Sequence, residues 1–420
     1  MKSTEFSLRV AKDLDSADPL SKYRDRFHHP KQENGKDKLY FTGNSLGLCP
    51  TSVDDYLQTE LHAWKTLGSR GHVLAPIPWI EYHHSVKSSL AKIVGGLESE
   101  VIAMNSLTTN LHLMMTSFYN PIKGRDKILV LEDCFPSDRY AVTSQIRSHG
   151  LVPEETLIEV GPRPDQTFID EHDVAQLIEQ RGHEIALVLI EGVSYLTGQW
   201  FDLPFLAKVA RQKGCMVGFD LAHAVGNVPL ALHDWEVDFA VWCNYKYLNG
   251  GPGTVGGCFV HEKHGKRKNL SRLAGWWGHD ESRRFLMEKT FSAMDGVDGW
   301  CLSNAPVLLI AALRASMEIF DEVGMKALRE KSVQLTGFLE MGLQHCCEKD
   351  VKVLTPSQPH RRGAQLSLSF PGEGKKMFDD LNRNGVVCDW REPNVIRISP
   401  APLYTRYQDV YQFVELLSRV

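Results

Sequence analysis

The chain has 420 residues, of which 43% are hydrophobic, and its formal net charge at pH 7 is −5. This length and composition allow a large buried core and predict one large and one smaller domain. The slightly acidic balance gives no general attraction for nucleic acid or for an anionic membrane, so neither is expected as a partner.

The cysteines and the apolar segments exclude further classes of protein. Nine cysteines are scattered without a Cys-x-x-Cys pair, which predicts reduced thiols in a cytoplasmic protein and no metal site. Apolar stretches such as 305–313 are too short to cross a bilayer. Residues 1–20 carry charges throughout, which predicts a helical arm rather than a secretory signal.

Strands and helices are predicted to alternate from residue 38 to residue 260. Apolar runs predict strands at 38–41, 101–104, 127–131, 156–160, 185–190, 216–219, 237–242 and 255–260. Helices are predicted at 51–67, from about 107 to 119, at 169–180 and at 203–213. This alternation predicts an α/β fold, with a mostly parallel sheet wrapped by helices.

The pattern changes towards the C-terminus. Helices are predicted at 305–320, 325–347, 375–384 and 404–420, and short strands at 351–354, 364–370 and 395–398. This smaller-scale alternation predicts a separate α+β domain. We therefore expect three parts: residues 1–50 as an arm and loop belonging to the small domain, 51–320 as the large domain, and 321–420 as the small one.

Polar residues follow several of the predicted strands. Thr108 lies at a strand-to-helix turn, where free N–H groups and the helix dipole favour a phosphate, although a plain threonine cap explains it too. Phe135 and Asp138 follow the strand 127–131 and could contact a bound aromatic ring, but a core phenylalanine and a helix cap are the commoner explanations. Arg397, between apolar neighbours, fits an internal salt bridge and a bound carboxylate about equally well.

Residues 219–253 carry an acid, a histidine and a lysine behind two apolar strands. Asp220 ends one apolar run, His223 follows it, and Lys246 lies between a second run and the glycine-rich bend 250–253. Open α/β sheets bind ligands at the C-terminal ends of their strands, so one crevice is expected to hold all three. A lysine that forms a Schiff base and an acid that keeps the pyridinium nitrogen protonated are what a pyridoxal phosphate enzyme needs. Each residue alone fits an ordinary loop, but the combination favours the cofactor.

The segments Phe-Asp-Leu-Ala-His-Ala-Val-Gly-Asn at 219–227 and Asn-Tyr-Lys-Tyr-Leu-Asn-Gly-Gly-Pro-Gly at 244–253 closely resemble the kynureninase family. Further matching segments extend along nearly the whole chain. The resemblance implies a fold type I pyridoxal phosphate enzyme with a seven-stranded sheet in its large domain, working as a homodimer with shared active sites. Glu191 departs from the family pattern, because relatives are expected to have a small or apolar residue at this ring-side position.

The resemblance also implies a role for each site residue. Lys246 would carry the cofactor, Asp220 would stabilise the electron sink, and Tyr245 would anchor the phosphate and donate protons. The implied cofactor contacts are Leu107, Thr108, Phe135, Pro136, Ser137, Asp138, Asp220, His223, Tyr245, Lys246, Trp276 and Asn304. The implied substrate contacts are Ser45, His72, Asn304 and Arg397. From the pattern alone, Ser45 fits a turn, His72 a surface histidine and Asn304 a helix cap.

The reaction that the resemblance implies is hydrolytic cleavage of the Cβ–Cγ bond of L-kynurenine or L-3-hydroxykynurenine. His72 and Asn304 together favour the 3-hydroxy substrate. The alternatives are another fold type I enzyme, such as a cysteine desulfurase or an aminotransferase, and a non-catalytic protein that retains the fold. A desulfurase needs a reactive cysteine in a mobile loop, and none of the nine has that setting. The sequence has no Gly-x-Gly-x-x-Gly after a strand to indicate a dinucleotide site.

Overall fold

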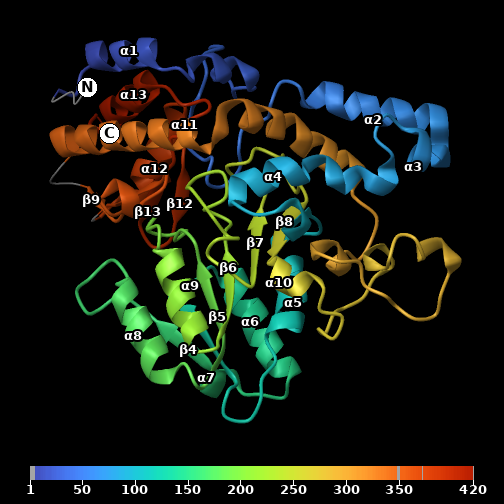
Figure 1. Cartoon of the computed structure of the whole chain (residues 1–420). Helices are drawn as coiled ribbons and strands as arrows, with labels where there is room; N and C mark the ends of the chain where they lie inside the picture. The colour runs from blue at the N-terminus through green and yellow to red at the C-terminus, as the bar shows by residue number, and fades with distance from the viewer. Residues whose placement is uncertain (1–4, 348–350, 371, 420) are drawn as a thin grey trace.

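The computed structural model describes residues 5–347, 351–370 and 372–419. Its larger part is built on a seven-stranded sheet with the strand order β2-β8-β7-β6-β5-β3-β4 (Figure 1). The strands are β2 (Val101–Ala103), β8 (Gly256–Val260), β7 (Phe239–Cys243), β6 (Met216–Asp220), β5 (Ile185–Glu191), β3 (Lys127–Leu131) and β4 (Leu157–Val160). The strand β8 runs antiparallel to both of its neighbours, β2 and β7, and all other neighbouring strands of this sheet are parallel. The predicted α/β class and the mostly parallel sheet are confirmed.

Helices cover both faces of this sheet. Along β3, Leu129 and Leu131 belong to one buried core, whereas Ile128 and Val130 belong to another, as expected where successive side chains point to opposite faces. The first core includes residues of α4 (Lys87–Val94), α8 (Glu171–Arg181) and α9 (Leu203–Gln212), and the second includes residues of α5 (Leu107–Phe118) and α6 (Pro136–Ser148). The helix α6 was not predicted from the sequence, although a proline at the first helical position favours a helix start.

A long helix, α11 (Val307–Cys347), runs from the large sheet to the smaller part (Figure 1). Its backbone is non-helical at Gly324, where φ is 73° and ψ is 150°. A positive φ favours glycine because no Cβ clashes there. The helices predicted at 305–320 and 325–347 therefore meet at one residue instead of at a loop.

The smaller part has an antiparallel sheet of four strands. Their order is β12 (Asp389–Arg391), β13 (Val395–Ile398), β10 (Leu366–Ser369) and β9 (Lys352–Val353). A third core joins this sheet to α13 (Tyr407–Leu417), to α1 (Leu8–Ala17) and to Phe41. The N-terminal arm is thus helical, and α1 packs against α13 in the smaller part. The domain boundaries at 50 and 320 stay a prediction.

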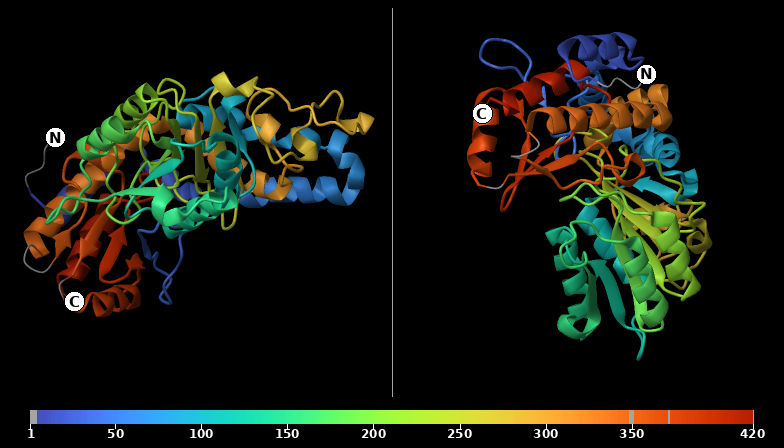
Figure 2. Two further views of the ribbon diagram at one scale, coloured as in Figure 1. Left: turned by 90° about the horizontal axis from the view of Figure 1, so that it is seen from below. Right: turned by 90° about the vertical axis from the view of Figure 1, so that its left-hand side faces the viewer.

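The remaining elements are short or lie at the periphery. They are β1 (Leu39–Tyr40), which pairs in parallel with β11 (Val386–Val387), and α2 (Val53–Leu67), α3 (Gly71–Leu74), α7 (Pro153–Thr156), α10 (Glu262–Gly265) and α12 (Gly374–Arg383). The 3-10 helices are η1 (Ser21–Arg26), η2 (Gly68–Arg70), η3 (Trp79–Val86), η4 (Glu98–Glu100), η5 (Trp276–Gly278), η6 (Arg284–Leu286), η7 (Val297–Trp300) and η8 (Pro359–Arg361). The helix α2 and the segment around η5 and η6 project to one side (Figure 2). Among the described helices, none has the length and apolarity needed to cross a membrane.

Candidate active site

A cavity of ≈ 280 Å³ lies at the C-terminal ends of the central strands. Asp220 is the last residue of β6, Glu191 is the last of β5, and Lys246 follows β7. The predicted site residues that line the cavity are Ser45, Leu107, Thr108, Phe135, Ser137, Asp220, His223, Tyr245, Lys246 and Arg397. The edge of the sheet therefore brings together side chains from loops that are far apart in the sequence, as is usual for α/β folds.

The amine of Lys246 lies at the centre of this group. Its Nζ is 3.0 Å from Nε2 of His223 and 6.0 Å from the centre of the Phe135 ring. Burial lowers the pKa of Lys246, and burial together with the nearby Lys246 charge lowers the pKa of His223 well below its usual value. Both shifts favour the neutral forms of the lysine amine and the imidazole. The neutral amine is the form in which a lysine acts as a nucleophile or base.

Two carboxyl groups, Asp220 and Asp138, act on the charge of this amine, and a third, Glu191, lines the same cavity. The Ala222 N–H donates a hydrogen bond of 2.7 Å to Oδ1 of Asp220, while Oδ1 of Asp138 has no hydrogen-bond partner within the described chain. Burial and the charge of Asp220 raise the pKa values of both Asp138 and Glu191 well above their usual range. Glu191 pairs in register with Asp220 and lines the cavity, so this unexpected residue does not turn away from the site.

The start of α5 forms the anion-binding side of the cavity. Leu107 and Thr108 occupy its first turn, and Ser106 caps it by accepting a hydrogen bond from the Thr109 N–H. The hydroxyls of Thr108 and Ser137 lie 2.9 Å apart. N–H groups in a first helical turn have no partner within the helix, and the dipole adds positive charge there. These groups together suit a phosphate.

Two arginines also line the cavity. Arg397 forms an ion pair with Asp389 and donates a hydrogen bond of 2.7 Å to the carbonyl of Tyr195. The same Asp389 also pairs with Arg391, at 2.9 Å, and Arg391 lines the cavity as well. The internal salt bridge considered for Arg397 is therefore present, but one carboxylate compensates two guanidinium groups. Arg391 was not predicted as a site residue, because β12 is short and carries no apolar alternation that would mark it.

Five predicted site residues do not line this cavity. Pro136 and Asp138 lie in the first turn of α6, next in sequence to the lining residues Phe135 and Ser137. The other three belong to other parts of the fold. His72 packs edge-on against Trp79, with ring centres 5.5 Å apart, and Trp276 is exposed, its indole N–H donating to the carbonyl of Arg284. Asn304 lines a separate cavity of ≈ 320 Å³. Within one chain these last three residues do not join Lys246.

The residues of the cavity fit pyridoxal phosphate. Buried polar atoms without a partner in the described part of the chain include Oδ1 of Asp138 and Nδ1 of His223. The start of α5 suits the phosphate of the cofactor, and the Phe135 side chain would pack against one face of the cofactor's ring. The cavity thus offers an amine, acids and an anion site in the places where this cofactor requires them.

The fold and the site define a pyridoxal phosphate enzyme of fold type I. A C-DES mutant solved with glycine covalently linked to its PLP cofactor has a TM-score of 0.78 and 17% identity, covering 94% of this chain and 98% of its own. The apo cysteine desulfurase of Thermococcus onnurineus NA1 has a TM-score of 0.76 and 16% identity, covering 100% and 99%. At these identities the likeness concerns the fold alone.

Sequence comparisons identify the family. A kynureninase from Myxococcus xanthus is 51% identical over 98% of this chain and 97% of its own length, and one from Koribacter versatilis is 49% identical over 96% and 95%. The model of the kynureninase C-terminal domain matches residues 328–417, and that of the DegT/DnrJ/EryC1/StrS aminotransferase family matches 81–230. The chain belongs to the kynureninase family.

Replacing Glu191 by Gln should change stability in a pH-dependent way. A carboxyl whose pKa is raised on folding stabilises the native state only below its unfolded pKa, near 4.3, and that contribution is lost as pH rises to the folded value. The apo variant should therefore be more stable than wild type at pH 7 by at least about 1 kcal/mol, and the difference should close below about pH 4. Urea unfolding between pH 3 and pH 8 measures this. Glu179→Gln, at an exposed position of α8, is the control, and a pH-independent gain for Glu191→Gln would contradict the prediction.

Proposed function

We propose that this chain catalyses pyridoxal phosphate-dependent hydrolysis of L-kynurenine or L-3-hydroxykynurenine. The products are anthranilate or 3-hydroxyanthranilate and L-alanine, in tryptophan catabolism and NAD biosynthesis. The observation that carries the proposal is about half identity to kynureninases over nearly the whole chain. Under the same proposal the protein is cytoplasmic, which agrees with the free thiols of its described cysteines.

At the cofactor end of the cavity, each side chain would contact a particular part of the cofactor. Bound pyridoxal phosphate supplies an electron-withdrawing ring that stabilises negative charge on the carbons of an attached amino acid. Asp220 would hold the proton on the ring nitrogen, and Phe135 would cover one face of the ring. Thr108, with Leu107 and Ser137 beside it, would bind the phosphate.

Proton transfer falls to Lys246. Its lowered pKa lets the amine accept a proton from Cα of the substrate and return it elsewhere. His223, 3.0 Å away, would position this amine, and Asp138 would hydrogen-bond next to the ring. Tyr245 would anchor the phosphate and, since burial raises its pKa, would keep its hydroxyl proton available for donation.

The substrate end of the cavity recognises an amino acid. Arg397 would bind the α-carboxylate through its planar fork, and Arg391 adds positive charge beside it. Ser45 lies where it can contact the substrate. The substrate's ring would meet His72 and Asn304 of a second subunit, a pair that favours the 3-hydroxy compound.

A homodimer would supply those missing residues. An apolar cavity of ≈ 340 Å³ opens beside α2 and α11, and large hydrophobic side chains are exposed around it and on the projecting segment. They include Trp64, Val73, Leu74, Leu308, Leu309, Phe285, Leu286 and Met287. Exposed apolar surface of this extent is typical of a protein interface. His72 and Trp276 lie on the same segments, so a partner subunit that covers this surface would contact both side chains.

Replacing Lys246 by Ala should abolish turnover while leaving the fold intact. The side chain carries both the cofactor attachment and the proton transfer, so activity should fall by more than about 1,000-fold. Product formation from both substrates, followed by absorbance, measures the loss. Borohydride should attach the cofactor covalently to Lys246 in wild type and not in the variant. Wild-type turnover in Lys246→Ala would reject the assignment, and a wild-type protein that cannot be reconstituted with pyridoxal phosphate would reject the enzyme itself.

Replacing Arg397 by Ala should mainly raise KM. Losing a buried charged hydrogen bond to a carboxylate costs 2 kcal/mol or more, so KM should rise at least about 30-fold. Asp389→Asn is the matched variant, because it removes the internal partner of Arg397 while keeping the guanidinium, and its KM should not rise. An unchanged KM in Arg397→Ala, combined with a lower Tm, would mean that this arginine serves only the internal ion pair.

Mixing two variants that each lack one half of the site should restore turnover of 3-hydroxykynurenine. Lys246→Ala retains His72 and Asn304, while the double variant His72→Ala, Asn304→Ala retains Lys246. In a mixed dimer one complete site forms, so re-associated equal mixtures should recover about a quarter of wild-type activity. The control mixture, Lys246→Ala with Asp220→Ala, should recover nothing, because both residues come from one chain. If the first mixture recovers nothing either, His72 and Asn304 do not serve a neighbouring site.

A further inference from the structure

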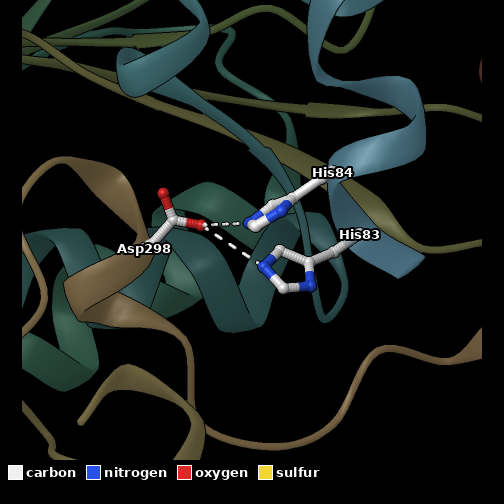
Figure 3. A group of neighbouring side chains, drawn as sticks. All are labelled: His83, His84 and Asp298. Carbon is white, nitrogen blue, oxygen red and sulfur yellow. Dashed lines mark ion pairs between the residues drawn. The ribbon is translucent and has the colours of Figure 1, made fainter. Parts of the chain in front are cut away.

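A cluster of two histidines and one aspartate lies away from the active-site cavity. His83 and His84 are consecutive residues of η3, and Asp298 belongs to η7. Both imidazole rings point their Nε2 atoms at the same carboxylate oxygen, Oδ1 of Asp298 (Figure 3). The separations are 3.4 Å for His83 and 3.8 Å for His84, and the three candidate ligand atoms all lie within 4.8 Å of one another.

The two oxygens of Asp298 have different environments. Oδ2 accepts a hydrogen bond of 2.5 Å from Nζ of Lys87. Oδ1 has no hydrogen-bond partner in the part of the chain that the structure describes, although Asp298 is only 7% exposed. A buried carboxylate oxygen without a partner is costly. The atom that lacks a partner is the one aimed between the two histidines.

The spacing of these atoms favours an ion over hydrogen bonds. Hydrogen bonds from nitrogen to oxygen are usually 2.7–3.2 Å long, so the 3.4 Å separation of His83 is a weak contact and the 3.8 Å separation of His84 is too long for a hydrogen bond. A tetrahedral ion with nitrogen and oxygen ligands at about 2.0–2.2 Å places those ligands about 3.3–3.5 Å apart. A small inward movement of the His84 ring would bring its Nε2, now 3.8 Å from Oδ1 of Asp298, into that range.

We propose that Nε2 of His83, Nε2 of His84 and Oδ1 of Asp298 form a binding site for a divalent transition-metal ion of the zinc class. His84 is half-exposed, with 43% of its side chain accessible, so the ion can enter from solvent and keep water as its fourth ligand. Lys87 then serves as the outer hydrogen-bond partner of the ligating carboxylate, an arrangement common around metal ligands. The cysteine pattern gave no sign of this site, since it uses no thiol.

In a second group of acidic and histidine side chains, the candidate ligand atoms already form hydrogen bonds within the chain. Glu100, His233 and His261 also lie within 4.8 Å of one another. However, the carboxylate of Glu100 accepts hydrogen bonds of 2.8 Å from the N–H groups of Leu97 and Glu262. Nδ1 of His261 accepts from the Lys263 N–H. Because these ligand atoms are already engaged by the backbone, the second cluster is not a metal site.

The position of the proposed ion suggests a stabilising role. It would join η3 to η7, and η7 is followed closely by the segment that carries Asn304. His83 and Asn304 line the same cavity. A bound ion would therefore fix two segments of the large domain relative to each other, without taking part in the reaction at Lys246.

Metal binding to the holoenzyme tests the site. After chelator treatment and dialysis, wild type should bind one zinc ion per chain in calorimetry, and zinc should raise its Tm. His84→Ala, chosen because this half-exposed side chain contributes little to the core, should weaken zinc binding more than about 100-fold and lose the rise in Tm. Cobalt in place of zinc should give the absorption of a four-coordinate site with nitrogen and oxygen ligands, without thiolate charge-transfer bands.

Two control variants separate this site from general histidine binding. His183→Ala removes an exposed histidine 3.8 Å from Glu184, and His233→Ala removes a histidine of the second cluster; both should bind zinc like wild type. Asp298→Asn should behave like His84→Ala if it folds. Absence of zinc binding in wild type, equal binding in His84→Ala, or thiolate bands with cobalt would each overturn the proposal.

Discussion

The burial of the Lys246 amine among other ionisable groups is the constraint on which the site depends. Burial is the main cause that lowers its pKa, while the charges of Asp220 and Asp138 act in the opposite direction. Burial and the charge of Asp220 raise the pKa values of Asp138 and Glu191 well above their usual range, because carboxyl groups that share a small buried volume oppose one another's ionisation. The resulting environment holds an amine that can lose its proton next to acids that can supply one, and this combination is what proton transfer requires.

The sheet makes this crowding possible by holding its strand ends rigidly. The register places Glu191 beside Asp220 at adjacent strand ends, and β7 delivers the segment that carries Lys246. Close packing fixes β7 itself: a Cβ at Gly257 of β8 would lie 2.0 Å from the Trp242 ring. Glycine at that position lets the indole pack across β8, and its Nε1–H donates a hydrogen bond of 2.8 Å to Asn244. The loop before Lys246 therefore has little freedom.

Site residues that follow apolar strands could be predicted from the sequence, whereas site residues that come together only through tertiary packing could not. Apolar runs ending in Asp220 and leading to Lys246 were enough to place both at one sheet edge. Nothing local marks Arg391 as a neighbour of the cavity, because that depends on how β12 pairs in the smaller sheet. His83 and Asp298 likewise meet only through the packing of distant segments. His72 and Asn304 were assigned by family resemblance, and a single chain does not bring them to Lys246, so their roles rest on the proposed dimer.

The arginines at the substrate end are coupled to the chemistry at the other end. The positive charge of Arg397 lowers the pKa of both Lys246 and His223, and Asp389 compensates only part of the charge of the two arginines that it contacts. In the proposed reaction, a substrate carboxylate bound to Arg397 would add the missing negative charge. Because an added negative charge favours protonated nitrogen, the proton affinity of any free Lys246 amine would rise once the substrate is in place. Binding of the α-carboxylate would thus make Lys246 a stronger base when the substrate is in place and its Cα proton can be removed.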